Sequence, residues 1–129
     1  MGVEIVGSQI QEVYSDVKIR CDYPITATHG TITFKWMDVR GSKYIPMCWT
    51  DLQAKSFRHL SSYPCRLYVM GFGYIKVVLE NIQYGGKVIC SYAADGNKAL
   101  ESEPAQLQIS RKYHYVNSSI LLCISYYLC

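Results

Sequence analysis

Val17-Lys18-Ile19-Arg20-Cys21-Asp22 is the most informative stretch of this chain, because apolar and charged residues alternate along it. Such alternation predicts a β-strand with one buried face and one face in water. Trp36 follows Cys21 by 15 positions, and Cys90 follows Cys21 by 69 positions. Both of these later residues also lie in β-rich runs, so the three residues belong to three separate predicted strands.

A cysteine, a tryptophan and a second cysteine at these spacings are typical of the immunoglobulin fold. In that fold the two cysteines bond across two packed sheets, and the indole ring packs on the bond. We therefore predict an all-β protein, an immunoglobulin V-type sandwich of two antiparallel sheets with Greek-key topology. Cys21 would bond to Cys90 with Trp36 in the core, and extra strands between Trp36 and Arg66 indicate the variable type. The alternative is another disulfide-rich β fold in which the three residues are unrelated.

Turn residues separate further short β-rich runs along the chain, as expected for an antiparallel sandwich. The further predicted strands are 10–14, 31–39, 44–48, 66–70, 74–79, 87–93 and 104–110. Residues 49–64 have no clear period, and we predict an edge strand plus a loop there. We assign residues 1–112 to the V-type domain and 113–129 to a stalk or hydrophobic tail.

The composition fits one globular domain in an oxidising compartment. The chain has 129 residues, 50% of them apolar and 18% charged, so it can bury a core. A net charge of +3 is too small for an obligate nucleic-acid binder, and six cysteines indicate an extracellular location. Residues 1–9 lack the apolar run of a signal peptide, so we expect a mature domain preceded by an initiator methionine.

The C-terminal segment leaves several alternatives open. Residues 120–129 are apolar but make up only about half of the roughly 20 residues that span a bilayer. They form either a hydrophobic tail or the first half of a membrane helix. Cys123 and Cys129 could pair locally, link two chains as a dimer, or be lipidated. Asn117 begins a glycosylation sequon at the place where a stalk would be glycosylated.

The stretch from Val17 to Pro24 resembles a strand of V-type leukocyte receptors. The chain is similar to the triggering receptors on myeloid cells, the natural cytotoxicity receptors and the polymeric immunoglobulin receptor-like domains. Trp36, Cys48, Arg66 and Val77-Val78-Leu79 fit the pattern of this group, over about residues 9–110. The resemblance implies an immune receptor ectodomain that signals through a partner adaptor or through its own tail.

Three features depart from that group. Met37 stands where a second cysteine usually pairs with the one at Cys48. The turn Tyr84-Gly85-Gly86-Lys87-Val88-Ile89-Cys90 lacks the usual acid and corner tyrosine, so Arg66 loses its usual ion-pair partner. The last strand lacks the Gly-x-Gly bulge of antibody domains. A divergent homologue fits these departures, from a distant vertebrate receptor or a viral copy of one.

Cys48 and Cys65 bracket the region between two predicted strands and could staple its long loop. The alternative is two free buried thiols. We favour the bond, because Met37 occupies the position where the resemblance would place another cysteine to pair with Cys48.

The chain carries no motif for catalysis. His29, His59 and His114 lie in predicted loops, and none has a serine or cysteine motif beside it. The sequence has no Gly-rich phosphate loop, no H-E-x-x-H or C-x-x-C motif and no paired carboxylates. We therefore expect neither an enzyme nor a cofactor or metal site.

V-type domains present three loops at one end, and here we predict them at 24–30, 49–57 and 93–100. The candidate ligand-binding residues are Thr28, His29, Gly30, Trp49, Thr50, Asp51, Tyr92, Asp95, Gly96, Asn97 and Lys98. Trp49 and Tyr92 are the expected anchors, since these residue types dominate interface energies. Alternatively, Tyr92 is an ordinary strand residue and Trp49 covers an edge.

Residues 35–66 carry six basic and two acidic side chains, so this region is more positive than the chain as a whole. We predict a basic edge formed by Lys43, Lys55 and Arg58. It would attract an acidic partner: a protein, a glycan or an anionic lipid. The alternative is a solvated edge strand that its lysines protect against aggregation.

The sequence thus predicts an extracellular domain that binds a macromolecular ligand, either as a cell-surface ectodomain or as a secreted protein. One alternative is a secreted or viral decoy that captures a cytokine or another immune ligand. Another is an adhesion domain that pairs with its own kind.

Overall fold

The protein is all-β, as its sequence predicts. The structure, a computed structural model, describes residues 1–60 and 64–111, and within these ranges it has strands and no helix. The strands are β1 (Gly2–Ile5), β2 (Ile10–Glu12), β3 (Val17–Asp22), β4 (Thr31–Asp38), β5 (Ile45–Asp51), β6 (Ser56–His59), β7 (Cys65–Met70), β8 (Tyr74–Leu79), β9 (Gly86–Ala93), β10 (Leu100–Glu101) and β11 (Ala105–Ser110).

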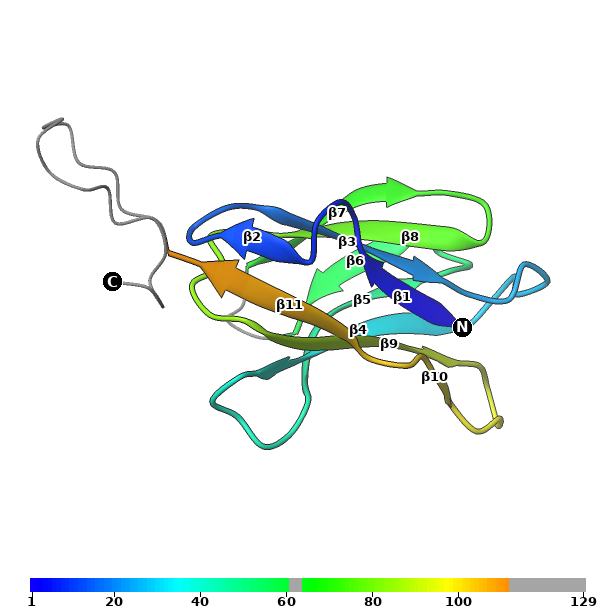
Figure 1. The fold of residues 1–129 in the computed structure, drawn as a ribbon. Helices are drawn as coiled ribbons and strands as arrows, with labels where there is room; N and C mark the ends of the chain where they lie inside the picture. The colour runs from blue at the N-terminus through cyan, green and yellow to red at the C-terminus, as the bar shows by residue number, and fades with distance from the viewer. Residues whose placement is uncertain (61–63, 112–129) are drawn as a thin grey trace, which may run out of the picture.

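Two sheets pack against each other as a sandwich (Figure 1). The smaller sheet has the order β1-β3-β8-β7, and the larger has the order β2-β11-β9-β4-β5-β6, with β10 paired to β9. Neighbouring strands run antiparallel except β2 and β11, which pair in parallel, so the prediction of purely antiparallel sheets is wrong for this pair. After β1 the chain passes Gly7, whose φ of 89° suits glycine, and crosses to the other sheet beside β11.

Alternation along the strands builds the core between the two sheets. Val17, Ile19 and Cys21 of β3 are buried from one side. Phe34 and Trp36 of β4 are buried from the other side, and only 2% of Trp36 is exposed. Burial of these large apolar side chains is the main free-energy term that holds the sheets together.

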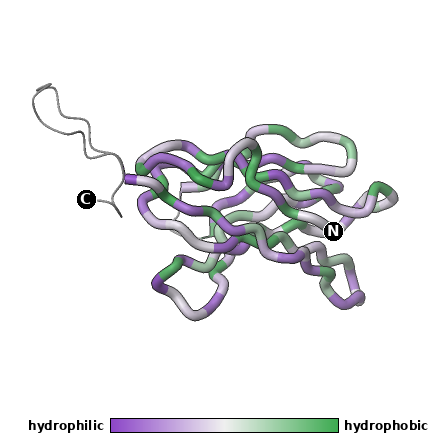
Figure 2. The backbone as a smooth tube through the Cα atoms, viewed as in Figure 1, coloured by the Kyte–Doolittle hydropathy of each residue, from purple (hydrophilic) through white to green (hydrophobic). Residues whose placement is uncertain are grey.

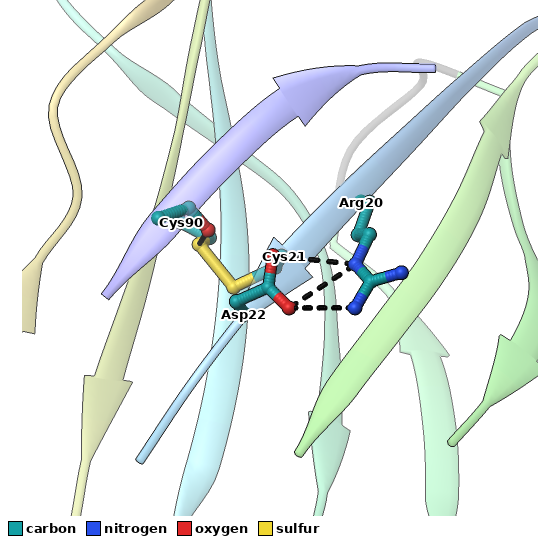
Figure 3. Close-up of polar contacts among 5 residues, drawn as sticks. Arg20, Cys21, Asp22 and Cys90 are labelled. Atoms are coloured by element: carbon teal, nitrogen blue, oxygen red, sulfur yellow. Dashed lines mark hydrogen bonds and ion pairs between the residues drawn. A yellow bond between two sulfur atoms is a disulfide. The ribbon is translucent and has the colours of Figure 1, made fainter. Parts of the chain in front are cut away.

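A disulfide bond joins Cys21 on β3 to Cys90 on β9, which is the pairing that the sequence predicts. The bond crosses from one sheet to the other, as Figure 3 shows, and the two Cα atoms lie 6.1 Å apart. Trp36 belongs to the same buried cluster as both cysteines. Cys21, Trp36 and Cys90, which are far apart in the sequence, therefore lie together in the core.

A second disulfide bond joins Cys48 on β5 to Cys65 on β7. Both residues are fully buried, and their Cα atoms lie 6.3 Å apart, within the usual range for such bonds. This bond also links the two sheets, toward the side formed by β6 and β7. Within residues 1–60 and 64–111 every cysteine is thus paired.

The region after Cys48 differs from its prediction. β5 continues to Asp51 instead of ending at Cys48, because β6 pairs alongside it and satisfies its backbone hydrogen bonds. The reversal between the two strands is therefore short, covering only residues 52–55. β1 at the N-terminus was not predicted as a strand, and it extends the smaller sheet by pairing with β3.

Some predictions lie outside the described residues: the tail 113–129, the sequon at Asn117, and Cys123 and Cys129. In the described part of the chain, no helix has the length and apolar character needed to cross a membrane. The last described strand, β11, ends at Ser110, close to the domain boundary predicted at 112.

The ion pair predicted to be lost at Arg66 is replaced by another. Arg66 Nε lies 3.3 Å from the Glu80 carboxylate, directly after β8. Both side chains are about half exposed, so the pair contributes at most about 1 kcal/mol. Val88 stands where the resembling domains have the corner tyrosine. It is buried, and its apolar side chain needs no hydrogen-bond partner.

Candidate functional site

Four chain reversals meet at one end of the sandwich, which we call the loop end. They are residues 23–30, 52–55, 71–73 and 94–99. Strand register brings them together: Thr31 lies opposite both Asp51 and Ala93, and Asp22 lies opposite Tyr74. Figure 1 shows the reversals after β3, β7 and β9 at the right of the view.

Backbone hydrogen bonds tie three of these reversals to one another. The N–H of Leu52 donates to the carbonyl oxygen of Gly30 at 2.9 Å, and that of Tyr23 donates to the carbonyl of Gly73 at 3.0 Å. Residues 23–30 therefore contact the β5–β6 turn on one side and the β7–β8 hairpin on the other. The three reversals form one connected surface.

Gly30 is required by the geometry of the first loop. Its φ is 105°, and a Cβ atom there would lie 2.6 Å from the carbonyl oxygen of Ala93 and 2.8 Å from the ring of Tyr92. The Tyr92 hydroxyl in turn donates to the carbonyl oxygen of His29 at 2.9 Å. Tyr92, on β9, therefore holds this loop in position.

The turn at 52–55 is stabilised by the residue before it. An Asp51 carboxylate oxygen accepts hydrogen bonds from the backbone N–H groups of Gln53 and Ala54, at 3.0 and 2.8 Å. Lys55 then closes the turn with a φ of 54° and is exposed. The carboxylate of Asp51 is thus engaged by the turn, while the ammonium group of Lys55 faces solvent.

Six of the predicted ligand-binding residues are exposed at the loop end, namely Thr28, His29, Asp95, Gly96, Asn97 and Lys98. The last four lie in the loop after β9, where the N–H of Asn97 donates to the carbonyl oxygen of Ala94 at 3.1 Å. These residues can contact a ligand without rearrangement of the strands.

Trp49 and Thr50 are not loop residues, so the prediction of a loop at 49–57 is wrong. Both lie on β5, where the pairing with β6 sets Trp49 opposite Arg58 and Thr50 opposite Phe57. Thr50 is fully buried and therefore closed to a ligand. Trp49 is half-buried on the sheet, with the Arg58 guanidinium 5.3 Å from its ring centre, so it is not an anchor at the loop end.

The predicted basic edge is not one compact patch. Lys43 precedes β5 and Lys55 follows it, so the length of the strand separates them, about 20 Å for seven residues. Among the other cations of this region, Lys35 pairs with Glu101 at 3.0 Å and Arg40 pairs with Asp38. Lys35 and Arg40 are therefore neutralised by ion pairs, while Lys43, Arg58 and Lys55 are spread along the β5–β6 side of the sheet.

The opposite end of the sandwich carries a cavity of about 850 Å³ beside Asp38, Tyr84 and Arg111. Asp38 accepts hydrogen bonds from the backbone N–H of Arg40 at 2.8 Å and from its guanidinium at 3.0 Å. The guanidinium of Arg40 lies 3.6 Å from the ring centre of Tyr84. These hydrogen bonds from Arg40 hold the pKa of the Asp38 carboxyl below its usual value.

Two exposed apolar side chains at the loop end are not among the binding residues predicted from the sequence. Ile25 lies in the first loop and Phe72 at the tip of the β7–β8 hairpin. The sequence did hold a signal, because Phe72 stands between two glycines in a turn, where polar residues are usual. Its proximity to Ile25 could not be read from the sequence.

Within residues 1–60 and 64–111 no cluster of three His, Cys, Asp or Glu side chains could hold a metal ion. Compared with known proteins, the chain matches no family model and no curated protein. The candidate site therefore stands on geometry alone: a connected set of loops with exposed polar residues beside exposed apolar ones.

Proposed function

We propose that this protein is an immunoglobulin V-type domain whose loop end binds a macromolecular ligand outside the cell, as the ectodomain of an immune-type receptor. The observation that carries the proposal is the strand order. V-type domains have the order A-B-E-D in one sheet and G-F-C with C′ and C″ in the other. The orders β1-β3-β8-β7 and β11-β9-β4-β5-β6 correspond to these strand by strand.

Two further observations support the same proposal. The Cys21–Cys90 bond joins the strands that correspond to B and F, and Trp36 lies on the strand that corresponds to C. Two disulfide bonds fit an oxidising environment such as the extracellular space. A scaffold of this kind holds loops rigidly, which lowers the entropy lost when they bind a partner.

The proposal is tested by staining cells with the full chain, displayed as a tetramer. In one variant Thr28, His29 and residues 95–98 are replaced by glycine and serine at equal length. A matched variant carries the same replacement at residues 40–43, at the opposite end. We expect the wild type to stain some leukocyte classes. The loop-end variant should lose this staining, and the control variant should keep it. No staining of any cell class, or equal staining by both variants, would contradict the proposed function.

A further inference from the structure

The cavity of about 850 Å³ at the end opposite the loop end is within the usual size range of small-molecule sites, about 300–1,000 Å³. Its walls are residues 37–39 and 41 at the end of β4, residues 83–87 at the start of β9, and residues 106–109 and 111 of β11 and its end. We call it the β9–β11 pocket. In Figure 2 the β4–β5 loop, which projects at the lower side of the view, carries both apolar and hydrophilic colours.

The walls of the β9–β11 pocket are bonded to one another. The N–H of Val39 donates to the carbonyl oxygen of Gly85 at 2.9 Å, which ties the β4–β5 loop to the turn before β9. A Cβ atom on Gly85 would lie 2.6 Å from the carbonyl oxygen of Leu107, so this turn packs directly on β11. The guanidinium of Arg111 donates to the carbonyl oxygen of Gln83 at 2.7 Å. The pocket is therefore formed in advance, which lowers the entropy lost when a ligand binds.

One row of side chains crosses the floor of the pocket. Lys87 on β9 lies opposite Met37 on β4 and opposite Gln106 on β11, and all three line the pocket. Residues directly opposite each other on paired strands have Cβ atoms about 5 Å apart. Gln108 follows two positions after Gln106, on the same face of β11. An ammonium group thus stands beside two carboxamides, which can both donate and accept hydrogen bonds, with an apolar side chain on its other side.

The charge of the lining favours a ligand with a single negative charge. The charged residues of the lining are Asp38, Lys87 and Arg111, which gives 2 − 1 = +1. The Asp38 carboxylate is engaged by the guanidinium of Arg40 at 3.0 Å. Lys87 forms no ion pair within residues 1–60 and 64–111. A monoanion such as a carboxylate matches this charge, whereas a polyanion needs many cations.

We propose that the β9–β11 pocket binds a sialic acid at the end of a glycan chain. This sugar carries one carboxylate, several hydroxyl groups and an acetamido group that ends in a methyl. Lys87 pairs with the carboxylate, Gln106 and Gln108 form hydrogen bonds with hydroxyl groups, and Met37 and Val39 contact the methyl. A uronic acid has the carboxylate and the hydroxyl groups but no acetamido methyl, so it uses only part of the pocket. The site is separate from the loop end and goes beyond the proposed function.

The test is a nuclear magnetic resonance titration of the full chain with the α-methyl glycoside of N-acetylneuraminic acid. Amide signals of residues 83–87 and 106–108 should shift and reach saturation, while those of residues 94–99 stay in place. The glycoside in which a hydroxyl replaces the acetamido group should bind about fourfold more weakly, the factor expected for one buried methyl. Methyl glucuronide should bind at least as weakly as that analogue.

A charge-removing variant tests the role of the lysine. Lys87→Gln should weaken binding of the glycoside about tenfold, because the carboxylate loses a charged hydrogen-bond partner. Lys18→Gln is the matched control, since Lys18 is also an exposed strand lysine but belongs to the smaller sheet. It should leave binding unchanged. Both side chains are exposed, so both variants should keep the thermal midpoint of the wild type, which excludes unfolding as the cause.

The inference is overturned if the glycoside causes no saturable shift, if the shifts lie at the loop end, or if Lys87→Gln binds as the wild type does. Equal binding of methyl glucuronide would also overturn it, because the pocket would then accept any sugar carboxylate. Staining of sialidase-treated cells reports the loop end without the pocket. If that staining depends on residues 28–29 and 95–98 while the glycoside does not bind, only this inference fails. If that staining is absent while the glycoside binds, only the proposed function fails.

Discussion

Asp38 shows how one carboxylate can organise an exposed loop. It is the last residue of β4, and its oxygens accept hydrogen bonds from both the backbone and the guanidinium of Arg40. Its own carbonyl oxygen accepts from the N–H of Gly41 at 2.7 Å. Arg40 is thereby held against the ring of Tyr84, which lines the cavity together with Asp38. The carboxylate thus connects the β4–β5 loop to the turn before β9.

The lowered pKa of Asp38 makes a prediction about pH. Because the folded protein binds the Asp38 proton less tightly than the unfolded chain, this group stabilises the fold above its unfolded pKa of about 3.9. The contribution is lost as the pH falls through the folded pKa. Asp38→Asn should therefore cost up to about 1 kcal/mol at neutral pH and progressively less as the pH falls below about 3.9. Urea unfolding of both proteins across this range measures the difference, and a cost that persists at low pH would contradict the assignment.

The start of β9 depends on a close approach between two strands. Gly86 lies opposite Asp38 on β4. A Cβ atom at Gly86 would overlap the carbonyl oxygen of Met37 and lie 2.8 Å from the indole of Trp36. Since both neighbours belong to the backbone or the packed core, neither can move away cheaply. Packing therefore requires a glycine at position 86, the first residue of β9.

Gly86→Ala should destabilise the protein by about 1–3 kcal/mol, the usual cost of adding atoms to a packed site. Gly2→Ala on β1 is the control, because nothing lies within 4 Å of the Cβ atom that it adds. Its effect should stay within about 0.5 kcal/mol. Denaturant midpoints of the two variants provide the comparison, and equal midpoints would show that β9 shifts to accommodate the methyl group.

The two disulfide bonds hold the whole sandwich together at two separate places. Cys21–Cys90 links β3 to β9 in the middle of both sheets, and Cys48–Cys65 links β5 to β7. The first closes a sequence separation of 69 residues and the second one of 17. A bond that closes a longer loop removes more entropy from the unfolded chain.

Removing the first bond should therefore cost more than removing the second. In the loop-entropy model, Cys21→Ala with Cys90→Ala costs about 4 kcal/mol, and Cys48→Ala with Cys65→Ala costs about 3 kcal/mol. Since small domains are stable by about 5–15 kcal/mol, either loss should lower the thermal midpoint by many degrees. Thermal unfolding of the two double variants ranks them, and the reverse order would show that the core around Cys48 matters more than loop length.

The sequence predicted those features that depend on local chemistry. Alternation of buried and exposed residues is a property of a single strand, so β3 could be recognised without any partner. The spacing of Cys21, Trp36 and Cys90 predicted the sandwich. The resemblance to V-type receptor domains, which would place a cysteine where Met37 stands, favoured the bond between Cys48 and Cys65. The exposed turn residues 95–98 were also visible, because turn residues have local backbone preferences.

The remaining features depend on pairing between segments that are far apart in the sequence. β5 runs through Trp49 and Thr50 because β6 folds back beside it, and that same strand separates Lys43 from Lys55. Ile25 and Phe72 become neighbours because β3 and β8 pair in a register that sets Asp22 opposite Tyr74. A residue's own chemistry favours a strand or a turn, but the register between strands determines which side chains meet, and register depends on the packing of the whole sandwich.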